Sequence, residues 1–272
     1  MKPAPFSLVR PATVEEALEA LRGGDAKLIA GGQSLLPMMN LRVATPDVLV
    51  DVCGLTELDR VVVTDDEVVF GALVCHDRLA RDPVVAHHAP LLAEAARHIG
   101  HVAIRNRGTL GGSLAHADPT AELPAMCVAL QAQLVCDRAD GRRRELPAEG
   151  FFQGLYATEL EPDEMLTWVR VPRLAPGSGV GFAEVAPREG DFAWAGAGVV
   201  YTAVGLRIVV FGLGSAPCVL TVPSVEIHSV GVRVSEWVAG LDPLDEPEFR
   251  RDLAVEMVHR AIAAASEGSS DE

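Results

Sequence analysis

Hydrophobic and polar positions near the start of the chain follow a helical pattern and then two strand patterns. Apolar residues at helical spacing come directly after Thr13-Val14-Glu15-Glu16, which is a capping-box sequence. This pattern predicts a helix that ends at Gly23-Gly24. The apolar runs 26–30 and 48–52 predict strands, so the chain begins as a β/α unit.

The middle of the chain carries alternating strand and helix signals. Two hairpins are predicted from apolar runs on either side of Asp65-Asp66 and Asp140-Gly141. The basic run Arg142-Arg143-Arg144 falls on the second hairpin, and we expect it to be solvated. The elements expected in this region are strands 61–63, 68–70, 134–136, 143–146 and 166–171, a helix over 83–99, and a helix from Pro119 to Leu130.

A segment rich in proline and glycine, 172–181, gives the best domain boundary. Beyond it the pattern predicts strands at 199–204 and 206–213, a helix over 247–265 and a frayed acidic tail at 266–272. The expected domains are therefore residues 1–172, with subdomains at about 1–56 and 57–172, and a smaller domain at 173–272.

Two glycine loops carry the clearest chemical signal. Each has adjacent glycines, which leave the backbone open to another molecule, tolerate positive φ and can turn N–H groups toward an anion. One such loop is typical of a tight turn. Two similar loops fit a ligand with a diphosphate gripped from both sides. The loop residues are Ala30, Gly31, Gly32, Gln33, Ser34 and Leu35 in the first loop and Thr109, Leu110, Gly111, Gly112 and Ser113 in the second.

Composition narrows the classes of partner. The chain has 272 residues and a formal net charge of −15, so it lacks the basic stripe that nucleic acid binding requires. No apolar stretch is long enough to span a bilayer, and the N-terminus lacks the apolar region of a signal peptide. We expect a soluble, cytoplasmic protein.

Metal sites and several enzyme motifs are not indicated. The five cysteines are scattered without a C-x-x-C pair, which argues against zinc, a disulfide framework or an iron–sulfur cluster within this chain. The Walker A sequence, the complete G-x-G-x-x-G and the Gly-x-Ser-x-Gly elbow are absent. His101 and His116 flank the second glycine loop, either near the ligand or on the surface.

Longer segments around both loops resemble a known family. Ala30-Gly-Gly-Gln-Ser-Leu-Leu-Pro-Met-Met-Asn-Leu-Arg42 is similar to the first flavin loop in FAD-binding subunits of molybdenum hydroxylases, such as carbon monoxide and xanthine dehydrogenases. Arg105-Asn-Arg-Gly-Thr-Leu-Gly-Gly-Ser113, followed by Glu122-Leu123-Pro124, is similar to the second loop. The likeness covers nearly the whole chain. It implies an α+β fold, in which a two-subdomain FAD-binding domain of the vanillyl-alcohol-oxidase/PCMH type precedes a smaller C-terminal α+β domain.

The resemblance also implies a function. Both glycine loops would bind the FAD diphosphate and neighbouring groups, Glu122 would hydrogen-bond to FAD, and Leu166 would lie against the isoalloxazine ring. Because the flavin supplies the chemistry, no catalytic side chain is assigned. The chain would be an electron-transfer subunit, partnered by a small [2Fe–2S] subunit and a large molybdopterin subunit in a dimer of heterotrimers. The substrate and the terminal acceptor are not indicated.

Two alternatives remain open at this point. Ala103 stands where relatives often carry glutamine, and Glu122 replaces the usual aspartate, which would suit a scaffold without redox activity. A stand-alone FAD reductase of similar fold is the other alternative, although no proton donor over the flavin is evident.

Overall fold

The N-terminal lobe is built on a parallel three-stranded sheet in the order β1-β3-β2. The computed structural model of the protein describes residues 2–22 and 26–268. Thr13 accepts a hydrogen bond from the Glu16 N–H at 3.2 Å, so the predicted cap is confirmed, whereas Gly23-Gly24 lies outside the described residues. The elements of the lobe are β1 (Ser7–Val9), α1 (Val14–Leu21), β2 (Ala26–Ile29), α2 (Leu35–Asn40), β3 (Val48–Asp51) and η1 (Thr56–Leu58).

The central sheet is antiparallel, in the order β4-β5-β10-β6-β7, and confirms both predicted hairpins. Its longest strand, β10, lies in the middle and ends at Pro172, as the sequence predicts. Beside this sheet lies a small two-stranded ladder of β8 and β9. The strands are β4 (Val61–Val63), β5 (Glu67–Gly71), β6 (Gln133–Arg138), β7 (Arg143–Pro147), β8 (Phe152–Gly154), β9 (Ala157–Thr158) and β10 (Glu164–Pro172).

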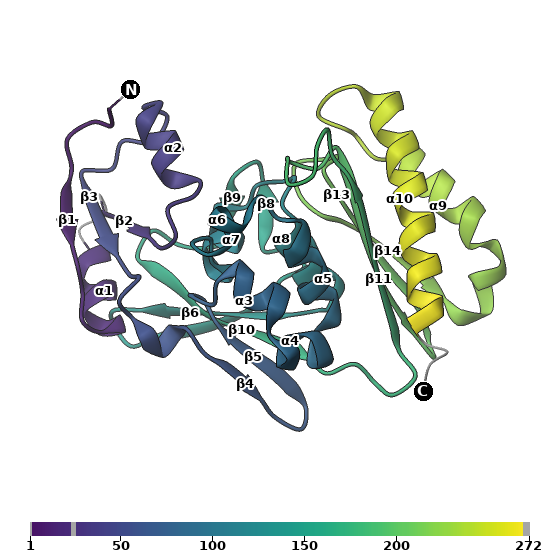
Figure 1. The fold of residues 1–272 in the computed structure, drawn as a ribbon, viewed down its shortest axis with the longest axis horizontal. Helices are drawn as coiled ribbons and strands as arrows, with labels where there is room; N and C mark the ends of the chain where they lie inside the picture. Colours follow the sequence, from purple (N-terminus) through teal and green to yellow (C-terminus); the bar gives the residue numbers. More distant parts are fainter. Residues whose placement is uncertain (1, 23–25, 269–272) are drawn as a thin grey trace.

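Helices cover the central sheet, and two sequence predictions about them are wrong (Figure 1). The helix expected over 83–99 is broken at Ala89, because Pro90 favours a helix start and cannot continue the preceding one. The helix expected from Pro119 begins only at Glu122, and a separate helix contains the second glycine pair. The helices are α3 (His76–Arg81), α4 (Pro83–His88), α5 (Pro90–His98), α6 (Val102–Arg105), α7 (Leu110–His116) and α8 (Glu122–Ala129).

The C-terminal part is a four-stranded antiparallel sheet, with α9 and α10 on its outer side (Figure 1). Strand β11 lies partly inside the segment expected to be a linker, and the sequence reading missed β14 and α9. From the sequence, the glycines of this segment indicate a flexible connection. In the structure Gly181 of β11 is needed for close packing, since a Cβ there would overlap the Ala261 carbonyl oxygen of α10. The elements are β11 (Gly179–Val185), β12 (Ala195–Thr202), β13 (Gly205–Phe211), β14 (Cys218–Pro223), η2 (Ser224–Ser229), α9 (Val230–Ala239) and α10 (Pro247–Gly268).

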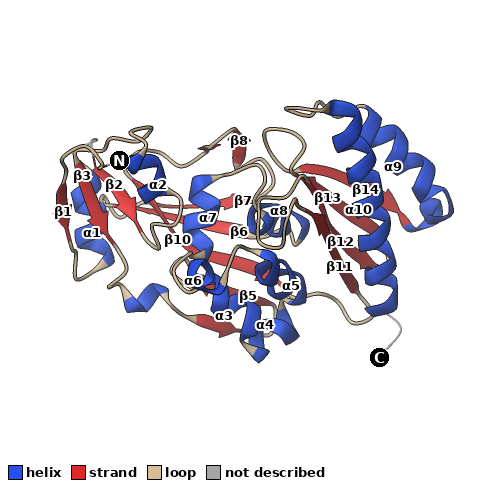
Figure 2. Ribbon diagram, turned by 45° about the horizontal axis from the view of Figure 1, so that its top comes forward, coloured by secondary structure: helices blue, strands red, loops and turns tan. Residues whose placement is uncertain are grey.

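Helix α10 extends further than predicted. It runs through residues 266–268, which the sequence reading assigned to a frayed tail, and residues 269–272 lie outside the described part. Helices α5 and α8 lie between the central and C-terminal sheets (Figure 2), and buried residues of both sheets join one hydrophobic cluster there. No helix within the described ranges is long and apolar enough to cross a membrane.

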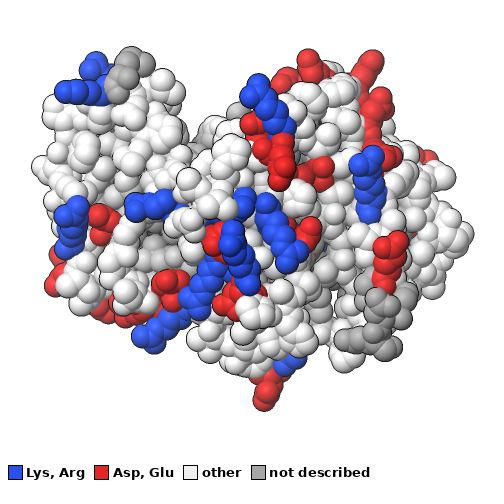
Figure 3. Space-filling model, viewed as in Figure 1, with Lys and Arg blue, Asp and Glu red and all other residues white. Residues whose placement is uncertain are grey.

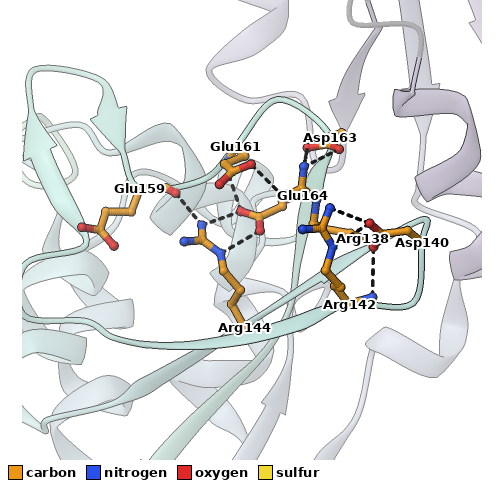
Figure 4. Close-up of polar contacts among 8 residues, drawn as sticks. All are labelled: Arg138, Asp140, Arg142, Arg144, Glu159, Glu161, Asp163 and Glu164. Carbon is orange, nitrogen blue, oxygen red and sulfur yellow. Dashed lines mark hydrogen bonds and ion pairs between the residues drawn. The ribbon is translucent and has the colours of Figure 1, made fainter.

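The basic run on the β6–β7 hairpin is only partly solvated, contrary to expectation. The Arg142 side chain is 67% exposed, but Arg144 forms a bidentate pair with Glu164 at 2.7 Å for both nitrogens. The Glu164 side chain is fully buried, and it also accepts a hydrogen bond from the Glu161 N–H at 3.0 Å (Figure 4). Arg144 therefore has a structural role although it is partly exposed, because it neutralises a buried carboxylate.

Candidate functional site

The first glycine loop connects β2 to α2 and presents a row of free backbone donors. Gly32 has a φ of +71°, which reverses the direction of the backbone within the loop. Among the described residues, none accepts a hydrogen bond from the N–H groups of Gly32, Gln33, Ser34 or Leu35. The Gln33 side chain donates to the Gly31 carbonyl oxygen at 2.9 Å and so stabilises the turn. Successive N–H groups around a positive-φ residue form a nest that favours an anion.

The second glycine pair is not an open loop but the first turn of α7. Thr109 is the N-cap, and its hydroxyl accepts from the Gly112 N–H at 3.1 Å. The N–H groups of Leu110 and Gly111 donate to Val74 and Ala72 carbonyl oxygens at 2.9 and 2.8 Å. These amides are already used, so the second loop differs from the first in what it offers an anion. The sequence predicts that this loop lies just before the N-terminus of the helix expected from Pro119, and this is wrong because α7 begins at Leu110.

Backbone contact joins the two loops into one surface (Figure 1). A Cβ on Gly31 would overlap the carbonyl oxygen of Arg107, which lies two residues before Thr109. On the other side, a Cβ on Gly112 would lie 4.0 Å from the Ala30 Cβ. The loops can therefore meet only if residue 31 is glycine, whereas a Cβ on Gly112 would make ordinary contact with Ala30 and would crowd only the Thr109 Oγ1 of its own loop, at 2.8 Å.

His76 packs under the backbone of the second loop, and the sequence did not indicate this role. Its Nε2 donates to the Thr109 carbonyl oxygen at 3.0 Å, and its own N–H donates to Gly108 at 2.9 Å. A Cβ on Gly108 would lie 2.7 Å from the His76 ring, so the imidazole fills the space under the loop. Burial lowers the pKa of His76 to about 4. No short motif links residues 76 and 109, so a single sequence gives no signal for this contact.

We expect acid to lower the free energy of unfolding through protonation of His76. Between pH 6.5 and about 4 the unfolded chain protonates His76 while the folded one does not, so stability falls as pH falls through this window. We expect the free energy of unfolding of the wild type to drop by up to about 3 kcal/mol more than that of His76→Gln. Urea titrations at several pH values measure this difference. Equal pH dependence in both proteins would contradict the assignment of a buried neutral imidazole.

Unpaired cations lie beside the loops although the chain is acidic overall. Arg107 and Lys27 are exposed and make no ion pair with any described residue. Arg107 acts electrostatically on Cys53, whose thiol donates to the Ala30 carbonyl oxygen at 3.1 Å. Burial lowers the pKa of His116, and the Lys27 charge lowers it further. Positive charge near a nest of N–H groups suits a diphosphate.

A notch in the surface accompanies these features. Figure 3 shows it between the N-terminal lobe and the rest of the molecule, and basic side chains gather across the middle of the same face. Inner residues of the two loops, such as Gly31 and Gly111, are buried, whereas Gln33, Ser34 and Gly112 are exposed. The residues present therefore fit the diphosphate part of FAD, with the first loop supplying the free amides.

Not all residues predicted to contact FAD are exposed near the two glycine loops. Glu122 is 7% exposed at the start of α8, and Leu166 is 4% exposed within the central hydrophobic cluster. His101 is exposed, whereas the His116 ring packs against Tyr156 with ring centroids 5.0 Å apart. Contacts of Glu122, Leu166 and the loop residues with FAD stay predictions.

Comparisons with known proteins identify the family. A family model described as "FAD binding domain in molybdopterin dehydrogenase" matches residues 4–174. The chain belongs to this family. It is 37% identical to the 6-hydroxypseudooxynicotine dehydrogenase complex subunit alpha of Paenarthrobacter nicotinovorans, over 97% of this chain and 96% of the relative. It is 43% identical to the carbon monoxide dehydrogenase medium chain of Hydrogenophaga pseudoflava, over 74% and 70% of the two chains.

The fold agrees with solved structures of this family. A chain from the carbon monoxide dehydrogenase of Hydrogenophaga pseudoflava superposes with a TM-score of 0.91 at 35% identity, covering 97% of this chain and 98% of that one. The predicted family, the α+β fold class and FAD as the cofactor of this chain are confirmed. The protein is thus an FAD-binding subunit of the molybdenum hydroxylase type of dehydrogenase complex.

Proposed function

We propose that this chain is the electron-transfer subunit of its complex, passing electrons from [2Fe–2S] clusters of a partner subunit through FAD to a terminal acceptor. Bound FAD supplies chemistry in steps of one or two electrons. The protein supplies binding, orientation and electrostatics. No group of three or more histidine, cysteine or acidic side chains suited to a metal ion occurs among the described residues, and the described cysteines are all free.

The observation that carries the proposal is the contact between the two glycine loops. The first loop contributes unpaired N–H groups around Gly32, and Arg107 and Lys27 contribute charge. The segment leading into the second loop packs closely against Gly31 through the Arg107 carbonyl, and His76 holds the second loop through Thr109. We assign Ala30–Leu35 and Thr109–Ser113 to the FAD site, with Glu122 and Leu166 as further contacts. The domain limits 1–172 and 173–272 belong to the same proposal.

An electron-transfer subunit needs other subunits that supply its electrons and oxidise the substrate. A small [2Fe–2S] subunit would supply electrons, and a large molybdopterin subunit would oxidise the reducing substrate, in a dimer of heterotrimers. Two relatives are a "complex subunit alpha" and a "medium chain", which supports assembly of this chain with other subunits. The cytoplasmic location stays a prediction from the sequence.

Purification tests cofactor and partners together. We expect the chain, isolated from its native source, to be yellow, to release FAD and not FMN on denaturation, and to copurify with an iron–sulfur chain and a larger molybdopterin chain. Absorption spectra, chromatography of the released flavin and mass spectrometry of the complex measure this. A flavoprotein that purifies alone and turns over its own substrate would instead support a reductase. A protein that cannot be reconstituted with FAD would support a scaffold.

A further inference from the structure

Helix α2 is apolar but lies almost entirely at the surface. Asn40 is its single polar residue, yet Met39 is the one residue of the helix that is buried. Two more apolar residues follow at the end of the helix, where Leu41 is 62% exposed and Val43 is 70% exposed. A helix that is apolar on most sides is normally buried against another element. Adjoining apolar side chains left at the surface indicate a site of protein binding.

Arg42 lies between these two exposed residues in a strained backbone conformation. Its φ is +59°, and it ends α2 in a Schellman motif. The Arg42 N–H donates to the Met39 carbonyl oxygen at 3.0 Å, and the Val43 N–H donates to the Met38 carbonyl oxygen at 2.9 Å. Glycine is favoured at the position of Arg42 in this motif, because a Cβ is strained at positive φ. Arginine at such a position indicates that its side chain has a role which glycine does not fill.

The Arg42 side chain has no role within the described part of the chain. It is exposed, and its guanidinium makes no hydrogen bond or ion pair with any described residue. A cation near a helix C-terminus interacts favourably with the helix dipole, but position 40 or 41 would offer the same benefit without positive φ. The strained arginine is therefore better explained by contact with another molecule.

The surface around the end of α2 carries no negative charge. The chain has 38 acidic residues, but none of them falls within 1–14 or 26–46. The segment before β1 begins beside α2 in both ribbon views (Figure 1, Figure 2). Over this upper part of the N-terminal lobe, Figure 3 shows uncharged surface and basic side chains, without acidic ones. Such a surface is complementary to one with acidic groups around an apolar centre.

A second copy of this chain fits the surface poorly. In a symmetric dimer the same patch of both copies meets, so that two Arg42 side chains would face each other, and like charges repel. A head-to-tail contact with an acidic region of another copy would generate a ring or a filament. A different chain avoids both problems.

We propose that Leu41, Arg42 and Val43 form a docking surface for another subunit of the complex, which presents acidic side chains to Arg42 and apolar ones to Leu41 and Val43. The inference rests on the proposed function, which requires partner subunits without saying where they bind. Helix α2 begins where the first glycine loop ends, and its six residues span about 9 Å. A subunit bound at the end of α2 would therefore lie about one helix length from the free N–H groups of that loop.

Binding of the partner subunits to charge variants tests this surface. The probe is the iron–sulfur and molybdopterin subunits, purified together from the native source without this chain and titrated onto the immobilised full-length chain. We expect Arg42→Gln to weaken binding at least about tenfold and Arg42→Glu to weaken it further. Added salt should weaken binding of the wild type more than that of Arg42→Gln. Arg60→Gln, a change at another exposed arginine without an ion pair among the described residues, is the matched control and should bind like the wild type.

Arg42→Gly separates docking from folding. Glycine relieves the strain at positive φ, so we expect the thermal unfolding midpoint to equal or exceed that of the wild type. Binding of the partner subunits should nevertheless fall as in Arg42→Gln. A lower midpoint together with weaker binding would mean that Arg42 only stabilises the end of α2, and would overturn the proposal.

Crosslinking identifies the chain that covers the surface. A photo-crosslinking amino acid in place of Val43 should link to a partner subunit at a segment that contains acidic residues. Links to other copies of this chain alone would contradict the proposal, as would loss of FAD from Arg42→Gln with unchanged binding of the partners. If the wild type and all Arg42 variants bind the partners equally, the docking surface is wrong while the proposed function stands. If the wild type binds neither partner, the proposed function itself is wrong.

Discussion

Replacing Gly31 by alanine is expected to abolish retention of FAD. The added Cβ would overlap the Arg107 carbonyl oxygen, and backbone cannot swing away as a flexible side chain can. The two loops would have to separate, which breaks the surface that they share. We expect the dissociation constant for FAD to rise by at least about 100-fold, equivalent to about 2.7 kcal/mol. Fluorescence titration of the apoprotein with FAD measures the change.

A matched control exists close by in the same lobe. A Cβ on Gly54 would meet no atom within 4 Å, and its φ lies outside the strained positive range, so Gly54→Ala should bind FAD like the wild type. Circular dichroism of Gly31→Ala should show an otherwise intact fold, since most of the core lies elsewhere. Full FAD occupancy in Gly31→Ala would mean that the loop contact is not part of the cofactor site.

Replacing Arg144 by alanine is expected to destabilise the protein. Glu164 would lose its bidentate partner while its side chain stays fully buried (Figure 4). Uncompensating one charge of a fully buried pair costs about 3–5 kcal/mol, and because the Arg144 side chain is 34% exposed we expect a smaller loss of about 2 kcal/mol of unfolding free energy. Chemical denaturation followed by circular dichroism measures this loss.

The neighbouring arginine separates this effect from loss of surface charge. Arg142 pairs with Asp140 in water, so Arg142→Ala should change the unfolding free energy by no more than about 0.5 kcal/mol. Adding Glu164→Gln to Arg144→Ala should restore part of the lost stability, because a neutral amide is less costly to bury. Equal effects of Arg142→Ala and Arg144→Ala would contradict the role of Glu164.

Local patterns in the sequence predicted much of the fold. The capping box at Thr13, the hairpins on both sides of the central sheet and the end of β10 at Pro172 all depend on neighbouring residues. The glycine loops were found because each is contiguous in sequence. Their family context then identified the cofactor, which the loop geometry alone restricts only to an anion.

The errors arose where distant residues decide the structure. Helix α7 was missed because Gly111-Gly112 has poor helix propensity, and its first turn is stabilised by Ala72 and Val74 from another segment. The sequence predicts a domain boundary where β11 begins, because it does not reveal that Gly181 serves close packing against α10 and not flexibility. The role of His76 depends on its contact with Thr109 across the fold, which a single sequence does not record.

The meeting of the two loops has a consequence for synthesis of the protein on the ribosome. The first loop is made early, but Gly31 meets its partner at Arg107 only after some further seventy-six residues have been added. The sheet below the second loop closes later still, when β10 inserts between β5 and β6. The two glycine loops and the sheet beneath them are therefore complete in a nascent chain only after translation has passed Pro172. Binding of the cofactor must then follow synthesis of most of the polypeptide.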